Sequence, residues 1–287
     1  MSEIAIVTDT DASLPAELMQ HFGIYPVPIT VQFGEESFQS GVDIDDASLF
    51  ARVDLEGRLP TTSAPAPGKF LEVFQQALAD GAQQVLCFTV SKEVSASFDA
   101  AVNAASMLPD GAVTVVDTRS LSLGQGFMVL AAAEALQEGA DAAESLARAA
   151  AVGEQTHLFA ALSSLKYLAM SGRVGHLAAG FADLFNVKPI LTIRDARLEM
   201  LERVRTQRKA WTRLLSLSAE AIGPRPVLRM GVVHVNAPQA AEDFITQLRL
   251  NLPVPEEILV AELTPGLSVH TGAGLVGVAF VLGTSGA

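Results

Sequence analysis

Three short apolar runs in the first half of the chain each end in polar residues and lead into a helical pattern. They are EIAIVTD (3–9), QVLCFTV (84–90) and AVTVVD (112–117). A continuous apolar run of this length is typical of a strand buried on both faces, as strands of a parallel sheet are. Strands that alternate with helices predict an α/β fold, with helices on the faces of a mostly parallel sheet.

Helical and strand patterns between these runs complete the first half. The expected helices lie at 15–22, 45–54, 68–80 and 95–107, and two alanine-rich helices follow up to about residue 155. The run IYPVPITVQF (24–33) indicates a strand, and its Pro26 and Pro28 place that strand at a sheet edge because proline has no N–H to donate.

The pattern changes around His157, where strands become more frequent. Strands are expected at 157–165, at 187–206 as a pair joined at Asp195-Ala196, and at 227–235, 257–263 and 275–282; short helices are expected through 172–185 and longer ones at 206–221 and 238–250. We therefore predict an N-terminal α/β domain over 1–153 and a C-terminal α/β domain over 154–287.

Charge and composition exclude several classes of protein. The net charge is −13, whereas nucleic acids and anionic lipid surfaces attract basic proteins. No apolar stretch approaches the roughly 18 residues of a spanning helix. The acidic start MSEIAIVTDT does not resemble a signal peptide. The single cysteine, Cys87, cannot form an internal disulfide, which favours a cytoplasmic location.

The sequence contains no convincing motif for catalysis or for binding a cofactor or a metal. GAGLVG (272–277) has the spacing of a dinucleotide loop, but a strand rather than a helix follows it. No phosphate loop, kinase signature or nucleophile elbow occurs, and the five histidines lack metal-ligand spacing. The sequence predicts no catalytic residue, no cofactor and no metal.

Clustered hydroxyls are the feature that points to a ligand. Thr61-Thr62-Ser63 stand between prolines ahead of a helical pattern, where hydroxyls commonly cap a helix. Ser91, Ser95 and Ser97 follow a buried strand at the start of another helix. Such a junction supplies free N–H groups suited to an anion, so both the capping and the binding interpretation remain open. A third stretch, SGRVG (171–175), carries Arg173 on a turn.

These stretches and several others, in this order, resemble the DegV family of bacterial fatty-acid-binding proteins. Its better understood members are the carrier (FakB) subunits of fatty acid kinase. The similar stretches span essentially the whole chain: VTDTDASLP, YPVPITV, TTSAPAPGKF, SKEVSASFDAA, VVDTRSLSLGQG, LKYLAMSGRVG, VKPIL, VRTQRKA and VHTGAG.

The resemblance implies two α/β domains with a long-chain fatty acid buried between them. It implies that Thr62 and Ser95 meet the fatty-acid carboxylate, with Ser97 as a further hydroxyl. Two positions depart from the family pattern nearby, because Ala96 replaces a glycine of the serine stretch and Ser13 replaces an aspartate.

The resemblance also implies a group of cationic or polar side chains near the carboxylate. Arg173, Arg205 and His270 match the family's arginine and histidine positions, and Arg173 and His270 would help to bind the carboxylate. All three would face the phosphate that a separate ATP-binding catalytic subunit (FakA-like) transfers to make an acyl phosphate. Ala273 stands where the family has proline in the histidine motif.

Three functions follow as hypotheses. The leading one is a non-catalytic subunit that binds a fatty acid for a partner kinase and thereby serves phospholipid metabolism. The second is a lipid carrier or sensor without a kinase. The third is an enzyme acting on an acyl substrate, with Ser95 as nucleophile and His270 as base.

Overall fold

A computed structural model of the chain describes residues 3–172 and 187–284. Its residue contacts divide the chain into two compact units. The first unit contains Met1–Asp43, Thr62–Glu154 and Asp195–Arg197, and the second contains Ile44–Thr61, Gln155–Arg194 and Leu198–Ala287. Residues 44–61 thus pack with the second unit, although they precede residue 153, near which we placed the boundary; the division into domains at 153 stays a prediction.

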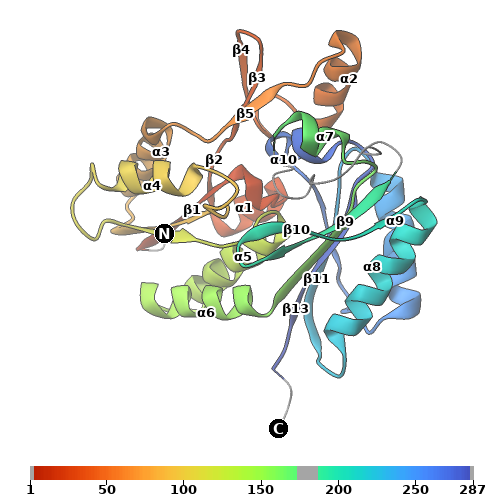
Figure 1. The fold of residues 1–287 in the computed structure, drawn as a ribbon. Helices are drawn as coiled ribbons and strands as arrows, with labels where there is room; N and C mark the ends of the chain where they lie inside the picture. Colours follow the sequence, from red (N-terminus) through yellow and green to blue (C-terminus); the bar gives the residue numbers. More distant parts are fainter. Residues whose placement is uncertain (1–2, 173–186, 285–287) are drawn as a thin grey trace. The chain divides into compact units, whose positions relative to one another are not determined.

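The first unit is built on the parallel sheet that the apolar runs predict (Figure 1). Its strand order is β2-β1-β6-β7, with β1 at Ile4–Asp9, β2 at Tyr25–Val27, β6 at Gln84–Thr89 and β7 at Val113–Asp117. Each neighbouring pair is parallel. The carboxyl ends of all four strands therefore meet at one edge of the sheet, where open α/β folds place their ligands.

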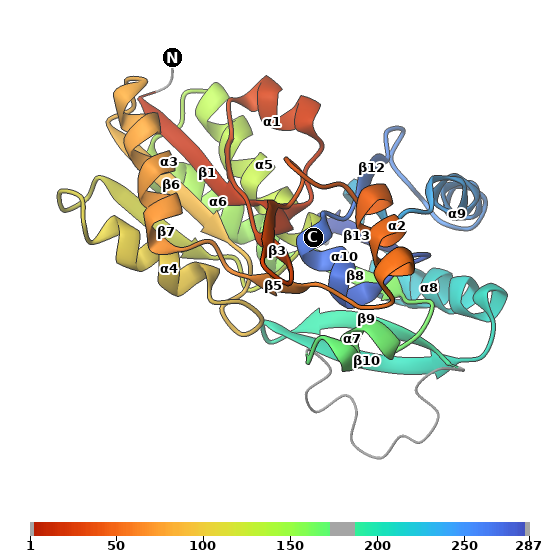
Figure 2. The ribbon, with the colours of Figure 1, turned by 90° about the horizontal axis from the view of Figure 1, so that it is seen from above.

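Helices cover both faces of this sheet (Figures 1 and 2). They are the short 3-10 helix η1 (Thr10–Ala12), α1 (Ala16–Phe22), α3 (Pro67–Ala79), α4 (Ser97–Ala105), α5 (Leu123–Gln137) and α6 (Ala142–Glu154). Phe70 and Phe74 of α3 pack with Val85 and Cys87 of β6 in one apolar cluster. Helix α5 is buried almost all round because it also packs against α6. The expected two-layer covering of the sheet is confirmed.

The run 24–33 does not form the single strand that we predicted. It divides into β2 and β3 (Thr30–Phe33), which belong to different sheets. Pro28 has no N–H, and the N–H of Ile29 donates to Thr10 Oγ1 at 3.1 Å, so the chain leaves the first sheet between the two strands. Strand β3 pairs with β4 (Glu36–Gln39) and β5 (Thr61–Ser63) in a three-stranded sheet of order β4-β3-β5.

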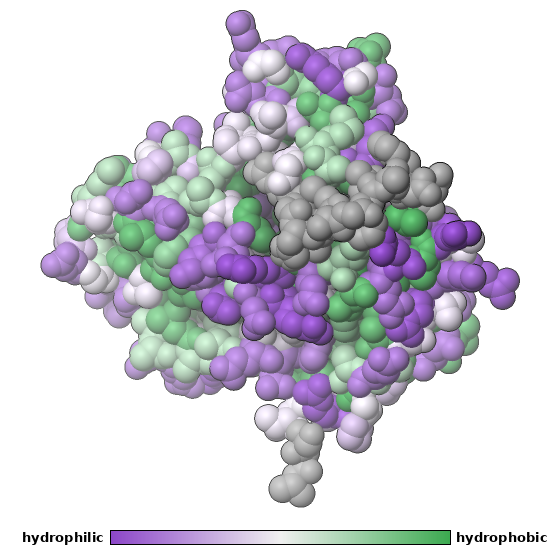
Figure 3. All heavy atoms as spheres, in the orientation of Figure 1, coloured by the Kyte–Doolittle hydropathy of each residue, from purple (hydrophilic) through white to green (hydrophobic). Residues whose placement is uncertain are grey.

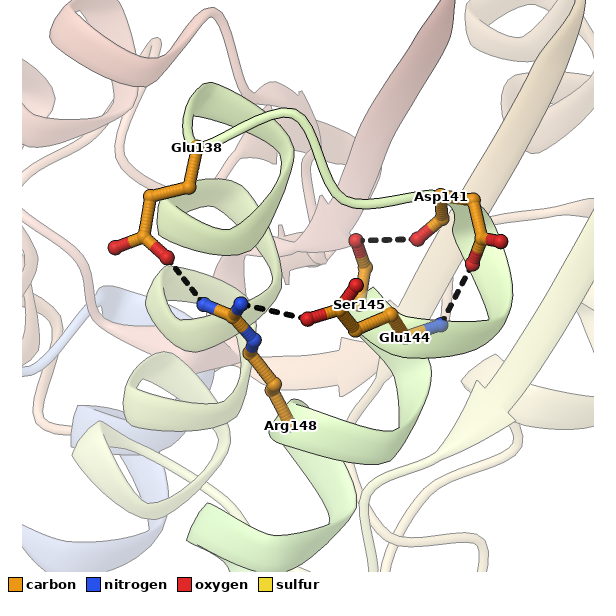
Figure 4. Close-up of polar contacts among 5 residues, drawn as sticks. All are labelled: Glu138, Asp141, Glu144, Ser145 and Arg148. Atoms are coloured by element: carbon orange, nitrogen blue, oxygen red, sulfur yellow. Dashed lines mark hydrogen bonds and ion pairs between the residues drawn. The ribbon is translucent and has the colours of Figure 1, made fainter.

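An ionic cluster holds the connection between α5 and α6 (Figure 4). Arg148 of α6 bonds Glu138 at the end of α5, and its Nη2 also lies 2.6 Å from Glu144 Oε1. Asp141 accepts the N–H of Glu144 at 2.8 Å, and its carbonyl accepts the Ser145 hydroxyl at 2.8 Å. The cluster satisfies the first free N–H groups of α6 and fixes the turn between the helices.

The second unit is built on a six-stranded sheet of order β10-β9-β8-β13-β11-β12. Its strands are β8 (Thr156–Ala161), β9 (Lys188–Arg194), β10 (Arg197–Val204), β11 (Val227–His234), β12 (Leu259–Glu262) and β13 (Val276–Leu282). Strand β13 is antiparallel to β8 and β11, whereas β11 and β12 are parallel. Strands β9 and β10 are joined at Asp195-Ala196 as expected, and both residues have positive φ angles.

The helices of this unit are α2 (Asp46–Glu56), α7 (Lys166–Met170), α8 (Gln207–Ile222), α9 (Pro238–Asn251) and α10 (Pro265–Thr271). Leu214 of α8 and Phe244 of α9 pack with Phe280 of β13 in the apolar core. The sequence did not predict α10, because its seven residues are too few to show a helical period. The expected short helices at 172–185 lie almost wholly outside the described residues.

No helix in the described parts of the chain is long and apolar enough to cross a membrane. Figure 3 shows hydrophilic and hydrophobic residues interspersed over the face that it draws. Hydropathy alone therefore does not single out one region of this face as a binding surface.

Gly126→Ala should destabilise the first unit. A Cβ at this position of α5 would lie 2.8 Å from the Ala12 carbonyl oxygen and 2.9 Å from Leu14 Cδ2. Relieving that overlap requires a shift of the loop after β1, at a cost of about 1–3 kcal/mol. Gly68→Ala is the matched control in helix α3, because its added Cβ meets nothing within 4 Å. Thermal unfolding followed by circular dichroism should show a lower midpoint for Gly126→Ala only.

Candidate functional site

Thr61, Thr62 and Ser63 do not cap the helix that follows them. They form β5, and the cap of α3 is Ala66, which makes no side-chain hydrogen bond to the helix. Thr61 and Ser63 are exposed, and Thr62 is half-buried. The capping interpretation of these hydroxyls is therefore wrong, and their binding role stays a prediction.

Polar side chains gather where the strands of the first sheet end. The buried ones near the ends of β1, β6 and β7 are Thr8, Asp9, Thr10, Asp11, Thr89, Ser91, Thr118 and Gln125. They tie neighbouring strand ends together. For example, the Thr118 hydroxyl donates to the Thr89 carbonyl at 2.8 Å, and the N–H of Ser91 donates to the Ser120 carbonyl at 2.8 Å. The edge of the sheet is thus a rigid polar platform.

The segment Val90–Ser97, which we call the serine loop, connects β6 to α4. Ser91 organises it, because its carbonyl accepts the N–H groups of Val94 and Ser95, both at 3.1 Å. Its hydroxyl accepts the N–H of Glu93 at 3.2 Å and donates to the Ala196 carbonyl at 2.7 Å. Ser91 is therefore fully engaged within the first unit and positions the loop.

Ser95 and Ser97 are brought together at the start of α4. Their hydroxyl oxygens lie 3.0 Å apart, and Ser95 Oγ also accepts the N–H of Ser97 at 3.3 Å. Ser97 is buried and Ser95 is half-buried. The cap residue Ala96 offers no side-chain oxygen to the helix. Two hydroxyls beside a helix N-terminus can donate hydrogen bonds to a carboxylate.

Asp9, which sequence reasoning did not single out, lies behind the serine loop at the end of β1. Its side chain is 0% exposed, and its Oδ2 accepts the N–H of Val90 at 2.8 Å. Its Oδ1 accepts from Gln125 Nε2 at 3.0 Å and from the N–H of Asp11 at 3.2 Å. Burial raises the pKa of Asp9 to about 6 against the lowering effect of these hydrogen bonds. An aspartate directly at the end of a buried strand is the signal that could have identified it.

His270, in the second unit, lies in the last turn of α10 and is half-buried. The loop after it is tightly held. Gly272 has a φ of 79°, and a Cβ there would overlap the Tyr167 ring. The Ser163 hydroxyl donates to the Ala273 carbonyl at 2.7 Å. The loop is thus fixed by its neighbours although Ala273 replaces the expected proline.

A buried carboxyl anchors α10 to α2. The Ser268 hydroxyl donates to Asp46 Oδ2 at 2.8 Å, and Asp46 is 1% exposed. Burial, with smaller contributions from the charges of Glu262 and Asp45, raises the pKa of Asp46 to about 7 against the lowering effect of the Ser268 bond. The pKa of this carboxyl therefore lies near neutral pH, well above that of an ordinary aspartate.

Arg205 and Arg173 are the remaining predicted site residues. Arg205 is exposed and lies between β10 and the cap of α8, Thr206. Arg173 lies outside the described residues. Thr62, Ser95 and Ser97 belong to the first unit, and Arg205 and His270 belong to the second. Within 3–172 and 187–284, no group of three or more His, Cys, Asp or Glu side chains could hold a metal ion.

The fold is that of an α/β protein of two compact units. The polar platform places clustered hydroxyls at the carboxyl edge of its parallel sheet. Residues 3–282 match the family model described as "Uncharacterised protein, DegV family". This chain belongs to the DegV family.

Named relatives agree with this assignment. A DegV domain-containing protein of Streptomyces coelicolor is 37% identical over 275 residues, which cover 96% of this chain and 97% of that protein. The structure described as fatty acid binding of a DegV family protein from Thermus thermophilus has a TM-score of 0.88 and 33% identity, and the match covers 98% of this chain and all of that one. DegV of Bacillus subtilis, described as a fatty acid binding protein, has a TM-score of 0.87 and 27% identity over 99% of this chain and 100% of its own.

Asp46→Asn should remove a pH dependence from the stability of the second unit. The folded pKa of about 7 lies above the ordinary 3.8, so the stabilisation from the neutral carboxyl is lost as the pH rises toward and through 7. Between pH 6 and 8.5 the wild type should lose about 1–2 kcal/mol of unfolding free energy through this group.

Denaturant unfolding at the two pH values measures the effect. The control is Asp45→Asn, which removes an exposed cap whose Oδ1 accepts the N–H of Ser48 at 2.7 Å. The pKa of Asp45 is lowered by that bond, so Asp45 is ionised throughout this range. Its variant should keep most of the wild-type pH dependence, moved slightly to lower pH, because the Asp45 charge is the smallest of the causes that raise the pKa of Asp46. An Asp46→Asn protein with the full wild-type dependence would contradict the assignment.

Proposed function

We propose that this chain binds a long-chain fatty acid and presents its carboxylate to a separate ATP-dependent kinase subunit. The observation that carries the proposal is the Ser95–Ser97 hydroxyl pair at the start of α4, in a chain of the DegV family. The structures from Thermus thermophilus and Bacillus subtilis, described as fatty-acid-binding, support the ligand class. We further propose that the protein works in the cytoplasm.

The chemistry of the hydroxyls suits a carboxylate that must stay reactive. A carboxylate removed from water needs hydrogen-bond donors or an opposite charge. Neutral donors such as Thr62, Ser95 and Ser97 can supply most of these hydrogen bonds, so the carboxylate oxygen keeps its nucleophilic character. The apolar tail supplies most of the affinity, because about 15 buried methylenes at ~0.8 kcal/mol each contribute ~12 kcal/mol before ordering costs.

The partner subunit would supply ATP and the phosphoryl-transfer machinery. A carboxylate oxygen forms a bond to the γ-phosphorus while the bond from that phosphorus to ADP breaks, which yields an acyl phosphate and ADP. Two anions approach each other in this step, so cationic or donating groups near the meeting point lower its barrier. We assign this role to Arg205, His270 and Arg173.

Thr62→Ala and Ser95→Ala should each weaken fatty-acid retention. A buried carboxylate that loses one donor is destabilised by about 1–3 kcal/mol, or about 5- to 150-fold in affinity. Native mass spectrometry of the purified protein, followed by lipid extraction, measures the bound fraction. The matched controls are the exposed Thr61→Ala and Ser106→Ala, the latter at the other end of α4. Retention equal to wild type in the Thr62/Ser95 double variant would disprove the hydroxyl assignment.

Arg205→Ala and His270→Ala should keep the fatty acid but lose most turnover with a fatty acid kinase catalytic subunit. Both groups act when the ATP phosphates arrive, whereas the hydroxyls hold the acid beforehand. Arg208→Ala is the matched control, since Arg208 is an exposed arginine in the first turn of α8.

Acyl-phosphate formation with magnesium and ATP is the measurement. The chain alone should form none, and turnover without the kinase would favour the enzyme hypothesis with Ser95 as nucleophile. Loss of lipid from either variant would move that residue to a binding role, and full turnover by both would disprove presentation. A wild type that retains fatty acid but supports no kinase would leave the carrier or sensor hypothesis.

A further inference from the structure

Burial of the Asp9 carboxylate lowers the stability of the folded chain. Asp9 is 0% exposed, and its three donors, the N–H groups of Val90 and Asp11 and the Gln125 amide, are all neutral. Burial of a carboxylate without a cationic partner favours its neutral form, which is why its pKa is raised to about 6. At neutral pH the first unit nonetheless holds a buried anion. An apolar side chain at this position would not carry the cost of removing that charge from water.

The bonds of Asp9 lead directly to the candidate head-group site. Val90, which donates to Asp9 Oδ2 at 2.8 Å, is the first residue of the serine loop. The next residue, Ser91, accepts the N–H of Ser95 at its carbonyl, and the Ser95 hydroxyl lies 3.0 Å from that of Ser97. Three hydrogen bonds and the short backbone segments between them thus connect the carboxylate at the end of β1 with the hydroxyl pair at the start of α4.

The other oxygen of Asp9 fixes the carboxylate itself. Gln125 of α5 donates from Nε2 both to Asp9 Oδ1 and to the Thr8 hydroxyl, each at 3.0 Å. Asp9 also begins η1, because its Oδ1 accepts the N–H of Asp11. The side chain therefore links β1, the serine loop and α5, and it cannot turn without releasing one of them.

We propose that Asp9 is the positioning residue of the fatty-acid head-group site: its ionised carboxylate holds the Val90 N–H and thereby sets the place of the Ser95–Ser97 hydroxyl pair. The inference rests on the proposed function, since it concerns the same hydroxyls. It adds that the site works only while Asp9 can accept at both oxygens. A protonated carboxyl has a donor on one oxygen, which then accepts more weakly, so either the bond to Val90 or the bonds on the other side are weakened.

Two other titratable groups lie beside Asp9, and the Val90 N–H bonds to Asp9 rather than to either of them. Cys87 of β6 is neutral over the range in which Asp9 titrates, because burial and the Asp9 charge raise its thiol pKa. Asp11 follows in η1 and is buried beside it. Asp9 is therefore the group whose protonation acts directly on the Val90 bond.

Asp9→Asn tests the proposal because asparagine keeps the shape but places an NH₂ group against an N–H donor. The probe is hexadecyl sulfonate, whose head group stays ionised, so the ligand itself does not titrate. At pH 7.5 the variant should bind it about 10-fold more weakly than wild type. Wild-type affinity should fall at least threefold from pH 7.5 to 5.5, and the variant should show no such fall. Asp141→Asn, an exposed acceptor in the α5–α6 turn, is the control and should behave as wild type.

Each outcome of these measurements supports or overturns the proposed role of Asp9. Circular dichroism at both pH values checks that the fold is intact, and hydrogen exchange of the Val90 amide should rise in Asp9→Asn. Equal affinity and equal pH profiles for wild type and Asp9→Asn would overturn the proposal. If the variant does not fold, the pH profile of Asp46→Asn decides, because this variant removes another carboxyl whose pKa lies near this range. An affinity that is unchanged at pH 5.5 then overturns the proposal, and a fall with intact fold supports it. A wild type that binds neither fatty acid nor sulfonate would instead disprove the proposed function.

Discussion

Parallel pairing of β1 with β6 is the constraint on which the candidate site depends. The pairing of Thr8 with Phe88 places the ends of both strands side by side, and the bond from Val90 N–H to Asp9 Oδ2 continues that contact beyond the sheet. Without this register, Asp9 would not face the serine loop, and Ser95 and Ser97 would lie on an unsupported connection. The hydroxyls can serve a ligand because a rigid sheet edge holds them.

The second unit uses a comparable device with different residues. Asp46 and Ser268 fasten α10 to α2, while Gly272 lets the following loop close against Tyr167. His270 lies on the helix that these contacts hold. In both units a buried aspartate with a raised pKa supports the element that carries a predicted site residue. Burying such groups lowers the stability of the folded chain near neutral pH. Destabilising groups of this kind are common at binding sites.

The sequence pattern predicted helices and strands correctly where many residues follow one hydrophobic period. The parallel sheet, its covering helices and the β9–β10 turn at Asp195-Ala196 followed from apolar runs and turn residues. The single strand over 24–33 was wrong, because the Ile29 bond to Thr10 turns the chain at a place where the apolar pattern continues. Helix α10 was missed because seven residues show no clear period. Both differences arise from contacts distant in sequence or from elements too short to leave a pattern.

The sequence by itself determined the α/β class, the clustered hydroxyls and, through nine stretches in order, the DegV family. Only the tertiary structure decided which hydroxyls cap helices and which do not: Thr61–Ser63 form a strand, and Ser95 bonds to Ser97. It also decided that Asp9 supports the serine loop, 81 residues away in the chain. The physical reason is that hydrogen-bond partners are chosen by the pairing of distant strands, whereas composition and period report only which side chains are buried.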